Sequence, residues 1–263
     1  MKQNYYYLVA GLPDLLPKEG IKGFEYRPIF EEIQDQLSES DAQVVAWLNY
    51  RFDNANLIAL LEKSDVFDDR GVFSREELIE ERAIAEKIPT YMVEFLEEVA
   101  EAGDTESDYE LLLNEKYYRA LMQQHSWLSS WAQYEVTQQN ITAALSARRL
   151  GLSVEDSVVI LSDVDEQIVK SSAADFGLSS QLPWLEKVIS AAGDNEKLEN
   201  VLDALAWEQA DALAELHYFT VEAILSFIIK LNSIERWKRL DSDRGAARLD
   251  ELLAELTSAL PQS

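Results

Sequence analysis

The chain of 263 residues contains no cysteine, which excludes disulfide bonds, thiolate metal sites and thiol nucleophiles. It has only nine glycines and six prolines, so few helix-breaking residues interrupt it. The longest apolar block, residues 219–231, contains Glu222 and Lys230 and is shorter than the ~18 residues that a membrane span needs. The amino terminus runs into tyrosines instead of an apolar signal-peptide core, so we expect a cytoplasmic protein with no direct bilayer insertion.

Positive charge is also scarce, because 23 lysines and arginines stand against 49 aspartates and glutamates and leave a net charge of −26. Nucleic acid is disfavoured as a partner, since its affinity for proteins comes mainly from basic groups that neutralise phosphates. Adsorption to anionic lipid is disfavoured for the same reason. A well-solvated acidic surface accounts for the excess, and a basic protein partner is the alternative. With 47% hydrophobic and 10% aromatic residues, the chain can bury a full core.

Most of the chain shows the apolar spacing of amphipathic helices, so we predict an all-α fold. Residues 38–41 are expected to interrupt the first helical stretch and to cap the helix that follows. Ser74 and Glu77 form a capping box whose helix should stop before Pro89, and another helix should occupy residues 90–102. The aromatic run at residues 5–9 favours an extended segment instead. Later helices are expected at residues 162–173, 183–191, from Asp194 onward, 219–240 and 244–259.

The strongest element is expected at residues 108–148, where apolar and aromatic residues alternate four and three apart. This heptad-like seam consists of Leu113, Tyr117, Ala120, Gln124, Trp127, Trp131, Tyr134, Gln138, Ile141 and Leu145. A single helix of that extent would be about 60 Å long at ~1.5 Å per residue. Arg148 and Arg149 followed by Gly151 mark its end. We therefore predict an elongated helical bundle around one long helix.

Two stretches of the chain echo each other at a fixed offset of 84 residues. The matched pairs are Trp47 and Trp131, Tyr50 and Tyr134, Asn56 and Asn140, Leu57 and Ile141, Ala59 and Ala143, and Leu61 and Leu145. Self-similarity at a long period indicates a structural unit that is built more than once. We divide the chain accordingly into an aromatic, turn-rich segment (1–27), a first helical module (28–105), a second module with the long helix (106–193) and a carboxyl-terminal module (194–263).

Catalytic motifs are few. His125 and His217 lie 92 residues apart with no serine or acidic partner at a diagnostic spacing, so each is interpreted as structural or exposed. No glycine-rich phosphate loop occurs. Two acidic clusters at residues 65–69 and 76–81 are the only candidates for chemistry, since paired carboxylates hold Mg²⁺ in all-α enzymes that act on pyrophosphate. Such an enzyme is one alternative function, and a generic helical adaptor is another.

Three patches of the chain resemble a known family, the C-type subunit of V-type and A-type ATPases, which is the d-type subunit in eukaryotes. Residues 53–61, D-N-A-N-L-I-A-L-L, resemble the D-x-x-N-L-x-x-[IL]-L segment of that family. Residues 140–145 are similar to the corresponding segment of a second repeat. Near the carboxyl end, residues 219–227 resemble its F-G-x-E-x-x-x-x-[YF] stretch and residues 234–238 its E-I-x-N-L-R stretch. The opening residues 4–15 resemble an uncharacterised bacterial family found with V-type ATPase genes in Bacteroides-like bacteria.

The resemblance implies a mechanical role. Proteins of the C-type family form a funnel of helices that sits on the membrane rotor ring and receives the foot of the central shaft, linking ATP turnover to ion movement. It implies a non-catalytic subunit without cofactor or metal, peripheral on the inner face of the membrane through the ATPase complex, whose partners are the shaft subunits and the ring. Aromatic anchors often dominate interface energy. The candidate partner-binding residues are therefore the echoed set Trp47, Tyr50, Asn56, Trp131, Tyr134 and Asn140.

Overall fold

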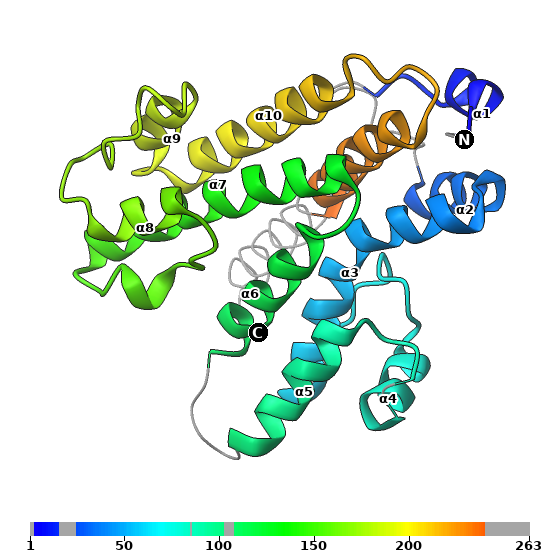
Figure 1. Ribbon diagram of the computed structural model, residues 1–263, viewed down its shortest axis with the longest axis horizontal. Helices are drawn as coiled ribbons and strands as arrows, with labels where there is room; N and C mark the ends of the chain where they lie inside the picture. The colour runs from blue at the N-terminus through cyan, green and yellow to red at the C-terminus, as the bar shows by residue number, and fades with distance from the viewer. Residues whose placement is uncertain (1–2, 16–24, 85, 103–107, 240–263) are drawn as a thin grey trace, which may run out of the picture.

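The computed structural model describes residues 3–15, 25–84, 86–102 and 108–239 (Figure 1). These residues form helices, turns and bends without any strand, which confirms the prediction of an all-α fold. No helix among them is both long enough and apolar enough to cross a membrane. In chain order the elements are α1 (Tyr6–Gly11), α2 (Tyr26–Gln36), α3 (Glu39–Leu61), α4 (Arg75–Ile84), α5 (Thr90–Ala102), α6 (Tyr109–Leu121), α7 (Ser126–Leu150), η1 (Glu155–Ser157), α8 (Asp163–Lys170), α9 (Leu185–Ala191) and α10 (Asn195–Ala214), followed by a helix that covers residues 221–239.

The predicted helix starts are confirmed where a side chain caps the backbone. Ser38 accepts a hydrogen bond from the backbone N–H of Asp41 at the start of α3. Ser74 and Glu77 make the reciprocal capping box, with Ser74 Oγ accepting from Glu77 N–H and the Glu77 carboxylate accepting from Ser74 N–H. Asp194 accepts from the N–H of Lys197 before α10. Each cap satisfies a donor that the first helical turn leaves free.

The prediction of an extended segment at residues 5–9 was wrong, because the chain forms α1 there. An extended strand needs a neighbouring strand for its backbone groups, and the described residues contain none. Tyr5 is instead held by tertiary contacts. Its backbone N–H donates to the carbonyl of Phe219 at 2.6 Å, and its hydroxyl bonds to Asp41. The side chain of Leu8 packs into the core from the same helix.

The prediction of one continuous helix over residues 108–148 was also wrong. The chain forms α6 and α7, which are joined by a turn at residues 122–125. The side chain of Gln124 caps a carbonyl at the end of α6, and the His125 ring accepts the backbone N–H of Trp127 at the start of α7. Because the chain turns at these residues, α6 packs against α7, and most of the predicted seam is buried within the fold. Ala120 and Leu145 are half-buried, and Gln124 is exposed in the turn. The expected carboxyl end is confirmed by Gly151, whose φ of 72° lies in the left-handed region.

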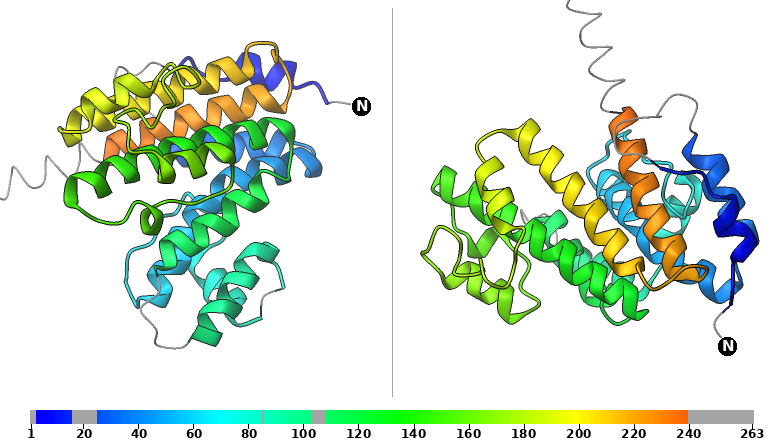
Figure 2. Two further views of the ribbon diagram at one scale, coloured as in Figure 1. Left: turned by 60° about the vertical axis from the view of Figure 1, so that its left-hand side comes forward. Right: turned by 90° about the horizontal axis from the view of Figure 1, so that it is seen from above.

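The remaining helices lie close to their expected positions, with α8 and α9 shorter than expected. The expected last helix, residues 244–259, lies outside the described residues. Helix α6 contacts α3, α5 and α7, while α10 contacts α7 and α9. Figure 2 shows α7, α10 and the helix of residues 221–239 running side by side, with α3 to α5 projecting from this layer. One continuous hydrophobic core joins the two parts.

Candidate functional site

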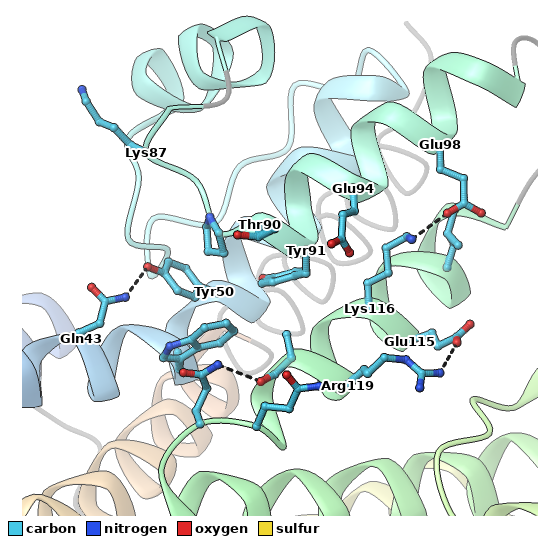
Figure 3. A pocket seen from close by; sticks show the side chains of 16 residues that line it. Gln43, Tyr50, Lys87, Thr90, Tyr91, Glu94, Glu98, Glu115, Lys116 and Arg119 are labelled. Atoms are coloured by element: carbon cyan, nitrogen blue, oxygen red, sulfur yellow. Dashed lines mark hydrogen bonds and ion pairs between the residues drawn. The ribbon is translucent and has the colours of Figure 1, made fainter.

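A groove between α3, α5 and α6 contains two of the six candidate residues (Figure 3). Its volume is about 760 Å³. Trp47, Tyr50 and Tyr91 form its aromatic floor, with Trp47 half-buried and the two tyrosines buried. The rings contact one another, since the centroid of Trp47 lies 5.5 Å from that of Tyr50 and 5.9 Å from that of Tyr91. Burial raises the pKa of the Tyr50 hydroxyl, which accepts a hydrogen bond from Gln43 and stays neutral.

Charged side chains form the rim of this groove (Figure 3). Lys116 pairs with Glu98 across α5 and α6 at 2.8 Å, and Arg119 pairs with Glu115 along α6 at 2.7 Å. Glu94 adds an exposed carboxylate. An aromatic floor with a charged rim is the usual arrangement of a protein-binding surface, because the floor supplies apolar area while the rim fixes the orientation of the partner.

Trp131 and Tyr134 lie in the interior instead. Trp131 is 2% exposed and stacks on Trp127, with ring centroids 5.9 Å apart. Tyr134 packs against Trp131 and Trp184 and accepts a hydrogen bond from Gln138 at 2.7 Å. The pair occupies in α7 the positions that Trp47 and Tyr50 occupy in α3, and Trp131 is more deeply buried than the half-buried Trp47. These two residues therefore contribute to the core in the described structure.

Asn56 clamps the backbone of a loop. Its side-chain amide donates to the carbonyl oxygen of Asp68 at 2.8 Å and accepts from the N–H of the same residue at 2.7 Å. Nearby, the carboxylate of Asp53 accepts the backbone N–H groups of Val72 and Phe73. One turn of α3 thus fixes the backbone between α3 and α4.

Asn140 makes the same double contact from α7. Its amide donates to the carbonyl oxygen of Val159 at 2.6 Å and accepts from the N–H of Val159 at 2.9 Å. It also donates to the buried carboxylate of Asp165 at 2.8 Å. Both echoed asparagines are therefore buried and bound to backbone, as expected for a side chain that replaces a local backbone partner. We call these contacts the Asn56 clamp and the Asn140 clamp.

An ion pair joins α3 to α7 at the offset of the echo. Arg51 donates to the Glu135 carboxylate at 2.7 Å, and the two residues are 84 positions apart. The Glu135 charge raises the pKa of Arg51 and outweighs the opposing effect of burial. Positions related by the echo are therefore in direct contact.

Asp53 has an unusual environment. Its carboxyl is fully buried, and burial raises its pKa to about 7, against the opposing effect of hydrogen bonds from Val72 and Phe73. The charge of Asp68 adds to the increase. Gly71 packs directly on this carboxyl, and a Cβ atom at Gly71 would overlap Asp53 Oδ1 and lie 3.0 Å from Cγ. Asp53 and Asn56 of the D-x-x-N motif therefore both hold the loop between α3 and α4 through its backbone.

The acidic clusters have other partners. Asp68 pairs with Arg70 at 2.6 Å and Arg239 at 3.4 Å. Partial burial raises its pKa, but the hydrogen bonds and charges of Arg70 and the charge of Arg239 outweigh it and lower the pKa. Asp69 also pairs with Arg239, and Glu81 accepts two backbone N–H groups. In the part of the chain that the structure describes, no group of three His, Asp or Glu residues is placed to hold a metal ion.

The structure reveals a cluster that sequence spacing did not indicate. Both histidines of the chain approach the same buried carboxylate oxygen of Glu222, His125 Nε2 at 3.6 Å and His217 Nδ1 at 3.7 Å. The hydroxyl of Thr220 bonds to the other oxygen of this carboxylate. The cluster ties the turn before α7 to the connection between α10 and the last described helix. Only the fold brings residues so distant in sequence together.

Comparison with known proteins assigns the chain to a family over most of its length. A family model described as "Protein of unknown function (DUF2764)" matches residues 1–259. No curated protein and no solved structure matches the chain.

Proposed function

The chain belongs to this family of unknown function over almost its entire length. We propose its role from the geometry and from the resemblance to the C-type subunit. It is a non-catalytic central-stalk component of a V-type ATPase or ATP synthase. In this role it joins the rotor shaft to the membrane ring and couples ATP turnover to ion transport. It is held at the inner face of the membrane through the complex.

The observation that carries the proposal is the matching pair of asparagine clamps. The asparagine of the D-x-x-N-L motif in α3 and its counterpart in α7 bind the N–H and the carbonyl of one downstream residue each. The two asparagines stand at the offset of the echo and make the same kind of double contact, one with a residue 12 positions downstream and the other with a residue 19 positions downstream. This likeness supports two copies of one module. Repeated helical modules are the architecture that the resemblance to the C-type family implies.

The groove between α3, α5 and α6 is the proposed seat for the foot of the shaft. With a volume of about 760 Å³, the groove has room for one face of a helical segment at the end of the shaft. Trp47 and Tyr50 on the floor would contact the apolar face of that segment. The opposed charges of Lys116, Arg119 and Glu94 on the rim would fix its rotation.

Rigidity is the second requirement of a coupling element. Transmitted torque demands that the modules do not slide on each other, and a continuous core supports this because packed interiors have low compressibility. The clamps stiffen the loops within each module. The Arg51–Glu135 pair adds a direct tie between α3 and α7.

The test is co-purification with a tagged copy of the chain from gently solubilised membranes of its own cell. The proposal expects both shaft and ring subunits to be recovered. Arg119→Glu, a reversal of a 58% exposed side chain on the rim, should lower recovery of the shaft at least ten-fold. Arg149→Glu is the matched control, because Arg149 is an exposed arginine outside the groove. Recovery of neither shaft nor ring would refute the role, whereas an inert Arg119→Glu would refute only the docking groove.

A further inference from the structure

An exposed aromatic surface lies at the end of the molecule where α1 meets the connection between α10 and the last described helix (Figure 1). Its members are among the most exposed large apolar residues described: Tyr6 at 54%, Tyr7 at 88%, Leu216 at 81% and Tyr218 at 69%. The Tyr6 ring contacts Tyr7 and Phe219, with centroids 5.6 and 4.7 Å away. We call this set the aromatic patch.

The patch has an ordered foundation. The backbone N–H of Tyr5 donates to the carbonyl of Phe219, which fixes α1 to the connection. Beneath the connection, His217 and Thr220 both contact the buried carboxylate of Glu222. Tyrosine side chains on fixed backbone lose little conformational entropy on binding, which makes them efficient contact residues.

The charge around the patch restricts its occupant. Residues 3–13 and 216–221 contain no Asp, Glu, Lys or Arg, in a chain whose net charge is −26. Exposed Asp14 and Glu215 adjoin these uncharged stretches, and Asp41 bonds to Tyr5. A second copy of the chain, which also carries a net charge of −26, would be repelled. Anionic lipid would be repelled for the same reason. Exposed apolar side chains around the contacting rings of Tyr6, Tyr7 and Phe219, with Asp14 and Glu215 adjoining in sequence, fit an apolar face flanked by cations.

We propose that the aromatic patch is a docking surface for a protein segment that presents apolar side chains together with lysine or arginine. The surface is separate from the groove between α3, α5 and α6, and the inference does not depend on the rotor role. Tyr7 and Leu216 supply the exposed apolar area, and the neighbouring carboxylates select a basic segment.

The test uses two synthetic 18-residue amphipathic helices, one of leucine and lysine and one of leucine and glutamate. Their binding to the full chain is measured by isothermal titration at about 150 mM ionic strength. The double variant Tyr7→Ser/Leu216→Ser removes apolar area without changing charge. Leu150→Ser/Leu152→Ser is the matched control, since these leucines are 65% and 61% exposed and lie at the end of α7 and just after it, away from the patch. Helical content and thermal unfolding of all variants verify that the fold is intact.

The proposal expects the lysine peptide to bind wild type and control with dissociation constants within two-fold, and the patch variant at least ten-fold more weakly. The glutamate peptide should bind none of them. Equal affinity of the lysine peptide for all three proteins would overturn the proposal, because attraction would then be a property of the net charge alone. Tight binding of the glutamate peptide would also overturn it. Two further results would do the same: patch-dependent binding to phosphatidylcholine vesicles without lysine-peptide binding, or patch-dependent dimerisation in sedimentation.

Discussion

The Asn140 clamp offers the sharpest test of how the fold is held together. Asn140→Ala would remove the donor to the Val159 carbonyl and the acceptor for the Val159 N–H, both of which are buried. It would also remove one donor to Asp165. A buried polar group without a partner costs ~1–3 kcal/mol, so two such groups cost about 4 kcal/mol. Alanine favours the helix over asparagine and returns about 0.6 kcal/mol. The expected loss of unfolding free energy is therefore about 3 kcal/mol.

Asn114→Ala is the matched control, because Asn114 lies half-buried on α6 and makes no side-chain hydrogen bond with the described residues. Both variants are measured by urea unfolding with circular dichroism and by thermal melting. At ~2–4 °C per kcal/mol for a chain of this size, Asn140→Ala should melt roughly 6–12 °C below wild type. Asn114→Ala should remain within about 0.5 kcal/mol of wild type. If the two variants were equally stable, the clamp would carry no energy and the reasoning would fail.

Three further predictions follow from neighbouring contacts. Gly71→Ala should lower the free energy of unfolding by about 2 kcal/mol, because the added Cβ would overlap the Asp53 carboxyl. Gly11→Ala is the control in the same urea titration and should be neutral, since open space surrounds Gly11. Asp53 has a pKa of about 7 in the folded chain against an ordinary 3.8, so the folded state favours its protonated form. The stabilisation that Asp53 gives the folded state is therefore fully present below pH ~4 and is lost as the pH rises to ~7. Wild type should therefore lose up to roughly 4 kcal/mol relative to Asp53→Asn across that window, and a pH-independent difference between them would contradict the assignment. For the ion pair, a double-mutant cycle with Arg51→Met and Glu135→Gln should give a coupling energy of about 1 kcal/mol, and additive effects would show that the contact is not stabilising.

Local signals in the sequence are sufficient where a side chain acts on its own helix. Ser38, Ser74 and Asp194 are predicted as caps and act as caps, because the capping bond reaches only two or three residues. Gly151 ends α7 for a similarly local reason, since its left-handed backbone disfavours other residues. The all-α fold is likewise predictable, because the helical spacing of apolar residues is a local pattern.

Tertiary contacts decide the elements that the sequence does not reveal. The seam from Leu113 to Leu145 has a helical period throughout, and period alone cannot reveal that the chain turns back at residues 122–125. The tyrosines of α1 have strand-forming propensity, but the contacts of Tyr5 with Phe219 and Asp41 outweigh it. Packing decides both cases: α6 contacts α3, α5 and α7, and Tyr5 and Leu8 are buried although Tyr6 and Tyr7 are exposed.

The candidate site is only partly accessible from sequence. The echo singles out six residues, and the structure places Trp47 and Tyr50 on a groove floor, Trp131 and Tyr134 in the interior, and the two asparagines in clamps. Trp47 is half-buried whereas Trp131 is buried, while both tyrosines and both asparagines are buried, because the exposure of each position depends on which elements pack above it. The His125–Glu222–His217 cluster has no sequence signature, since its members come from two distant turns and one helix start.

Membership of a rotary ATPase can be checked by identifying every protein in that enzyme. The V-type ATPase is purified from the cell of origin through a tag on one of its ATP-hydrolysing chains, and native mass spectrometry then counts its components. We expect one copy of this chain in each intact complex that contains both shaft and ring. A complete, proton- or sodium-pumping complex without the chain would contradict it.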